Sequence, residues 1–133
     1  MTEKSYTINP EEEDYLEWSK IALHDLESAE ILIREKGHSD IIIYHCHQCV
    51  EKILKSFLIF HKIPFKKIHN LDKLFSDVIK VNKSIMKYKD DILFLDGYRA
   101  KIRYPFGEDI SITEGKTCYG IANRVYKAMK EIM

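Results

Sequence analysis

The sequence has 133 residues, enough for one domain with a single hydrophobic core. Its 21 basic residues balance 21 acidic ones, so no overall positive field collects phosphates and bulk charge does not indicate nucleic-acid binding. Three cysteines are too few for a disulfide scaffold, and no apolar run is long enough for a signal peptide or a membrane span. We expect a single cytoplasmic domain over residues 1–133, loosely ordered at residues 1–10 and without membrane contact.

Sparse prolines and glycines leave long segments free to be helical. A first helix is predicted from just after Pro10 to Gly37, because apolar residues recur there at helical spacing behind an acidic first turn. A second helix is predicted over residues 38–62, where Pro64 stops it. Both helices have a broad apolar face, so we expect them to pack in one core.

Three further helices are predicted in the second half of the chain. Asn70 is a suitable cap for a short third helix, and a fourth spans residues 84–102. Ser111 with Glu114 forms a capping box for the fifth. No segment alternates long enough to be a convincing strand. The fold class is therefore an all-α, up-and-down bundle of four to five helices.

Asp25 lies within the apolar face of the first helix. A carboxylate buried there costs several kcal/mol unless it has a cationic or hydrogen-bonding partner. We therefore expect Asp25 to be a structural residue, held by an internal salt bridge or by a bond to a loop.

One strip of the second helix is polar over about 100° of arc. It contains Tyr44, Gln48, Glu51, Lys52 and Lys55. Glu51 precedes Lys55 by four residues, the favourable order for a helical ion pair. The strip has two interpretations: a solvated face opposite the core, or a binding surface with two ammonium groups for phosphate and a tyrosine for stacking.

The end of the fourth helix is basic, with Arg99, Lys101 and Arg103 followed by Tyr104. Positive charges stabilise a helix C-terminus, which is a sufficient structural reason for them. Arg103 and Tyr104 could also hold a phosphate or a base at the turn before Pro105, or Arg103 could pair with Asp25.

The run from His45 to Cys49 contains histidines and cysteines but does not predict a metal site. Cys46 and Cys49 face the apolar side of the helix, and no second Cys/His pair supplies further ligands. Phosphate-binding glycine loops and the common hydrolase motifs are also absent from the sequence. We predict core cysteines, no metal, no cofactor and no catalytic residues.

Four motifs follow one another along the chain: Ala22-x-x-Asp25-Leu26-x-x-Ala29, then Tyr44-x-x-x-Gln48-x-x-Glu51-Lys52-x-x-Lys55, then His69-x-Leu71-x-x-Leu74, and finally Arg103-Tyr104-Pro105. Together they resemble the HEPN domain family, and the last is similar to its branch ending in "RYP". The resemblance implies a dimeric bundle of four or five helices. It also implies a shared polar region, in which we class Asp25, Glu51 and His69 as structural and Gln48, Lys52, Lys55, Arg103 and Tyr104 as ligand-binding.

The family includes metal-independent ribonucleases, often toxins, and non-catalytic members; many are paired with a minimal nucleotidyltransferase, and nucleotide binding is proposed for several. The ribonucleases carry an arginine and a later histidine with four to six residues between them. Here Arg99, Arg103 and Arg124 have no histidine after them, and Arg34 is followed by His38 with only three residues between, so that motif is absent. We therefore expect a non-catalytic homodimeric module that binds a nucleotide or a partner nucleotidyltransferase through its polar strip. Ile41, Leu58 and Ile59 are available for the dimer contact. The alternative is an RNA-cleaving toxin that uses His69 as the base and Arg103 for the phosphate.

Overall fold

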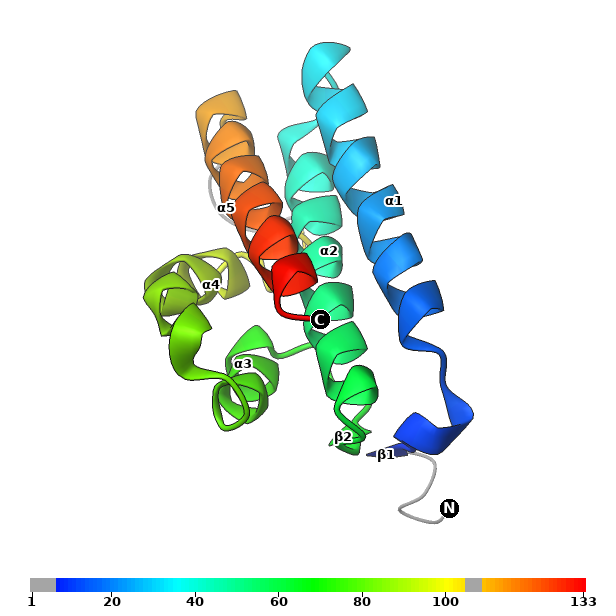
Figure 1. The fold of residues 1–133 in the computed structure, drawn as a ribbon. Coiled ribbons are helices and arrows are strands. Elements are labelled where there is room, and N and C mark those ends of the chain that lie inside the picture. Colours follow the sequence, from blue (N-terminus) through cyan, green and yellow to red (C-terminus); the bar gives the residue numbers. More distant parts are fainter. Residues whose placement is uncertain (1–6, 105–108) are drawn as a thin grey trace.

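The computed structural model describes residues 7–104 and 109–133 as a helical bundle (Figure 1). The helices are α1 (Tyr15–Arg34), α2 (Ser39–Phe60), α3 (Leu71–Ile79), α4 (Lys89–Asp96) and α5 (Ile112–Glu131). Two 3₁₀ helices, η2 (Pro10–Glu12) and η3 (Lys83–Tyr88), and two short strands, β1 (Thr7–Ile8) and β2 (Phe65–Lys66), complete the described elements. The predicted all-α bundle is confirmed.

α2 is the central helix, and it packs against α1, α3, α4 and α5 (Figure 1). α1 runs antiparallel to α2, while α5 runs parallel to it (Figure 1). The short helices α3 and α4 return the chain from the end of α2 to the start of α5. They take the place of the third helix of an up-and-down bundle, which is here divided in two. The antiparallel pair β1–β2 brings Ile8 opposite Phe65 at the end of the bundle.

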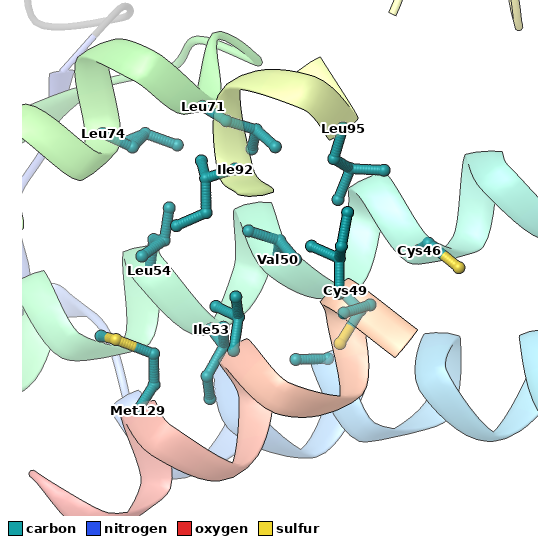
Figure 2. Packing of buried hydrophobic residues seen from close by; sticks show 14 of the residues in the cluster. Cys46, Cys49, Val50, Ile53, Leu54, Leu71, Leu74, Ile92, Leu95 and Met129 are labelled. Carbon is teal, nitrogen blue, oxygen red and sulfur yellow. The ribbon is translucent and has the colours of Figure 1, made fainter. Parts of the chain in front are cut away.

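The core is built on the apolar face of α2. Figure 2 shows Leu71 and Leu74 of α3 with Ile92 and Leu95 of α4 on one side of this helix, and Met129 of α5 on the other. All of these side chains are at most 1% exposed. Cys46 and Cys49 are fully buried in the same layer, as predicted from their helical positions.

Local caps place two helices where the sequence predicts them. Asn70 accepts a hydrogen bond from the Lys73 amide at 3.2 Å and begins α3. Ser111 and Glu114 form the complete capping box that begins α5. Each cap satisfies amide groups that a helix start leaves without partners.

The predicted fourth helix over residues 84–102 is wrong. Its first part is η3, its middle is α4, and the chain after Gly97 continues in turns to residue 104. Glycine is a poor helix former, and Tyr98 is instead fixed by tertiary contact, with its hydroxyl 3.1 Å from Glu114 Oε1 on α5. Arg99, Lys101 and Arg103 therefore do not stabilise a helix end.

The first helix also begins later than predicted, at Tyr15. Pro10 opens η2 instead, and Asp14 caps α1 by accepting from the Leu16 amide at 2.9 Å. Residues 1–6 of the segment expected to be loosely ordered lie outside the described residues, whereas Thr7–Ile8 pairs with β2.

Candidate functional site

Asp25 is joined to two side chains of α2, and we call Asp25, His45 and Lys52 the Asp25 cluster. Lys52 Nζ lies 2.7 Å from Asp25 Oδ2, and His45 Nδ1 lies 2.8 Å from Asp25 Oδ1. His45 and Lys52 are seven residues apart, about two helical turns, so both point toward α1. The expected internal salt bridge is present.

The partner of Asp25 is Lys52 rather than Arg103, which is exposed and has no ion pair among the described residues. Lys52 is consequently not a free surface residue, as its side chain is only 24% exposed. Reversing its charge would set a second carboxylate against Asp25, so we expect a charge reversal at this position to affect the fold.

Glu51, Lys55 and His69 form a second group, the Glu51 cluster. Lys55 Nζ lies 2.8 Å from Glu51 Oε2, and His69 Nδ1 lies 3.0 Å from Glu51 Oε1. Lys55 also lies over the Trp18 ring, 5.7 Å from its centroid, where cation–π attraction adds to the ion pair. The predicted i,i+4 pair is thus present.

This part of α2 is not a solvated face. The side chains of Glu51 and Lys55 are only 4% and 6% exposed, whereas the His69 imidazole is half exposed. The helical projection placed the pair opposite the core, but α1 on one side and the segment leading to α3 on the other cover it. A projection of one helix does not contain these tertiary neighbours.

The two clusters share one arrangement: each carboxylate uses one oxygen for a lysine and the other for a histidine. A carboxylate in such an ion pair only accepts, so the Nδ1–H of His45 and of His69 donates. Nε2 of each ring has no hydrogen bond among the described residues. Carboxylates that hold an imidazole in this way fix its tautomer and orientation, both in structural networks and in catalytic ones.

The other residues predicted to bind a ligand lie at or near the surface. Tyr44 is exposed and Gln48 half-buried on α2, one turn apart. Arg103 and Tyr104 are exposed in the turns after α4, and Arg103 joins neither cluster within the described part of the chain. Pro105 of the "RYP" motif lies outside the described residues. The described contacts therefore do not assemble the five residues that were predicted to bind a ligand into one site.

Sequence reasoning missed a third polar contact, inside the bundle. His47 Nε2 lies 3.0 Å from Asp96 Oδ1, and the same oxygen accepts from the Leu71 amide at 3.3 Å. Burial is the main influence on His47 and lowers its pKa, while the weaker effect of Asp96 opposes this. The sequence signal for this contact is a histidine beside the apolar face of α2. Its partner, Asp96, could not be identified from the sequence because it lies 49 residues away along the chain.

The cysteines are unsuited to nucleophilic or metal chemistry. Burial raises the pKa of the Cys46 and Cys49 thiols far above the ordinary value and that of Cys118 to about 12, so the reactive thiolates are disfavoured. Across residues 7–104 and 109–133, no three potential metal ligands converge. The described helices also include none that is both long and apolar enough to cross a membrane.

Two solved structures share the fold of this chain. The protein TT1696 from Thermus thermophilus has a TM-score of 0.80 at 17% identity, with 90% of this chain and 98% of that chain covered. An archaeal HEPN homologue, ST0689, has a TM-score of 0.71 at 22% identity, with 90% and 97% covered. These two likenesses show a common fold.

A protein of Methanocaldococcus jannaschii named "Putative toxin MJ1304" is 29% identical over 130 residues, which cover 86% of this chain and 84% of that protein. The family model for the HEPN domain matches residues 15–132. That match includes both clusters and all five helices, and it confirms the family resemblance read from the motifs. This chain belongs to the HEPN domain family.

Proposed function

We propose that this HEPN domain is a non-catalytic binding module, a homodimer that binds a minimal nucleotidyltransferase through the face of α2 carrying Tyr44 and Gln48. The observation that carries the proposal is the pairing of Lys52 and Lys55 with carboxylates at 2.7 and 2.8 Å. Lysines neutralised in this way offer little charge to a phosphate. An exposed tyrosine with few free charges beside it is instead typical of protein interfaces.

Nucleotide binding, which the family resemblance implies, then depends on Arg103 and Tyr104. Both side chains are exposed, and an arginine fork with an aromatic ring suits a phosphate and a base. Calorimetric titration with ATP and GTP tests this part. Binding should weaken in Arg103→Ala and persist in Arg34→Ala, which removes an exposed arginine from the end of α1; equal affinity in both variants removes Arg103 from the proposal.

Co-expression with a minimal nucleotidyltransferase encoded beside this chain tests the partner. We expect the two proteins to elute together from a sizing column. Tyr44→Glu should separate them because it places a charge in the contact, whereas Leu16→Glu, an exposed apolar position of α1, should not. Separate elution of the wild-type proteins, or an equal effect of both variants, contradicts the proposed partner face.

One observation favours a second candidate, an RNA-cleaving toxin. His69 is held by Glu51 through Nδ1 at 3.0 Å, and its ring is half exposed, so Nε2 is available as a proton acceptor. The Methanocaldococcus jannaschii relative is named as a toxin. Arg103 does not support this candidate. The toxin would need it beside His69 to hold the phosphate, and the described contacts do not bring the two residues together.

An RNA cleavage assay in EDTA separates the two functions. The binding module predicts that structured and single-stranded RNA remain intact after incubation with the wild-type protein. Cleavage that is lost in His69→Ala and kept in His24→Ala, a substitution of an exposed histidine on α1, would establish the toxin instead. Cleavage that survives both substitutions would contradict the binding module and assign the activity to a residue other than His69.

A further inference from the structure

A cavity of about 630 Å³ lies between α3 and the segment that follows α2. This volume is within the range of small-molecule sites in proteins. Its apolar lining comes from both walls: Ile63, Pro64, Phe65, Ile68 and Val81. Phe65 is buried, whereas Val81 is 43% exposed. The cavity therefore offers apolar surface that is open to a solute.

The charged residues of this cavity are mostly positive. Lys66, Lys73 and Lys80 line it together with one carboxylate, that of Asp77, which leaves a net charge of +2. Asp77 Oδ1 lies 3.0 Å from Lys73 Nζ and 3.7 Å from Lys80 Nζ, so a single carboxylate serves two ammonium groups. Lys66 has no ion pair among the described residues. Positive charge thus remains at the rim beside the apolar wall.

We propose that this cavity binds a small organic anion, with an aromatic or branched aliphatic body against the apolar wall and a carboxylate, sulfonate or phosphate group beside the lysines. An uncharged apolar solute would leave the rim charge unused, and an inorganic anion would leave the wall exposed to water. The site is separate from the proposed function, because its lining residues belong neither to the two clusters nor to the Tyr44 and Gln48 face.

Charge and shape can be tested with two dyes of similar body. 8-Anilinonaphthalene-1-sulfonate carries one negative charge, and N-phenyl-1-naphthylamine has a similar ring system without it. We expect the anionic dye to bind with 1:1 stoichiometry and more tightly than the neutral one at low salt, with the preference falling as salt screens the lysines. Equal affinity for both dyes, or no saturable binding of the anionic dye, overturns the proposal.

Variants and backbone amide NMR shifts locate the site. Lys66→Glu should weaken binding of the anionic dye roughly five-fold at low salt, because an attractive charge becomes repulsive. Val81→Trp should also weaken it by filling the cavity mouth. Lys130→Glu, an exposed lysine of α5, makes the same change in net charge and should have little effect. Amide shifts centred on residues 63–81 support the site; shifts centred elsewhere, or an equal effect of Lys130→Glu, overturn it.

Discussion

Glu51 and Lys55 form an ion pair almost fully removed from solvent, so each charge depends on the other. Removing the lysine leaves a buried carboxylate held only by His69, and such a loss costs about 3–5 kcal/mol. We expect Lys55→Met to lower the free energy of unfolding in urea by that amount. The double variant Glu51→Leu/Lys55→Met should recover much of it, because neither charge then remains buried.

The matched control is Lys73→Met, which breaks the more exposed i,i+4 pair with Asp77. Its effect should stay below about 0.5 kcal/mol. A double variant no more stable than Lys55→Met would show that packing of the lysine chain, and not charge burial, dominates at this position.

His47 makes stability depend on pH. Burial lowers its pKa from the ordinary 6.5, so the folded protein keeps the ring neutral to a lower pH than the unfolded chain does. Below about pH 6.5 the unfolded chain takes up the proton first, so this residue's contribution to stability is present above that pH and lost as the pH falls. Urea unfolding at pH 7 and pH 5 should show a decrease that is smaller in His47→Gln.

Glutamine keeps a side-chain N–H donor for Asp96 but does not titrate, so this variant isolates the proton effect. His24→Gln, at an exposed position of α1, should leave the decrease unchanged. The reverse result, a decrease that depends on His24 and not on His47, would contradict the assignment.

At the scale of elements, α1 and α2 end in the same unusual way. Lys36 and Lys62 adopt positive φ angles of 58° and 62°, the conformation that glycine usually supplies at this position. The Gly37 amide bonds back to the Leu32 carbonyl at 2.6 Å and the Ile63 amide to the Leu58 carbonyl at 2.9 Å, which is the Schellman arrangement. A side chain with a Cβ is strained there.

Glycine at either position should therefore stabilise the protein. The strain relieved is about 1–2 kcal/mol, partly offset by the greater entropy of glycine in the unfolded chain, so we expect Lys36→Gly and Lys62→Gly each to add about 0.5–1 kcal/mol. Thermal unfolding measures this. Lys20→Gly, inside α1, should instead destabilise by about 1 kcal/mol; a loss of stability in all three variants would show that strain at the helix ends is negligible.

The sequence predicted the elements whose ends are set locally. Asn70 and Ser111 each accept a hydrogen bond from an amide three residues away, so these caps can be predicted from residues close together in the sequence. The 84–102 segment could not be divided in this way. Its apolar spacing is compatible with one helix, and the break after Gly97 depends on contact with α5 through Tyr98.

The candidate site was predictable to a similar degree. Asp25 on an apolar face required a partner, and the Glu51–Lys55 spacing predicted an ion pair. Which residue pairs with Asp25 depends on how α1 and α2 are aligned, and no local pattern fixes that alignment. The burial of Glu51 beside His69 depends likewise on the path of the chain between α2 and α3.

At the scale of the whole molecule, the exposed residues of α2 determine where this helix can form a dimer contact. Three residues were expected to form a dimer contact. The prediction is wrong for Leu58 and Ile59, which are buried within this chain, while Ile41 is 42% exposed. Tyr44 lies one turn further on the same face and is equally exposed. Because Tyr44 belongs to the face proposed for the nucleotidyltransferase, we expect the two-fold contact to centre on Ile41, in the first turn of α2, and to leave Tyr44 accessible.

Light scattering behind a sizing column should therefore give about twice the 15.7 kDa chain mass at tens of micromolar. In a two-fold contact each residue near the axis meets its own copy, so Ile41→Glu places two carboxylates close together and should yield monomers. Leu16→Glu makes the same change at an exposed apolar position on another part of the surface, on α1, and should remain dimeric. Monomeric wild-type protein would refute the dimer. If Ile41→Glu remains dimeric, the two-fold contact lies away from this part of α2, for example at the exposed Leu93 and Phe94 of α4.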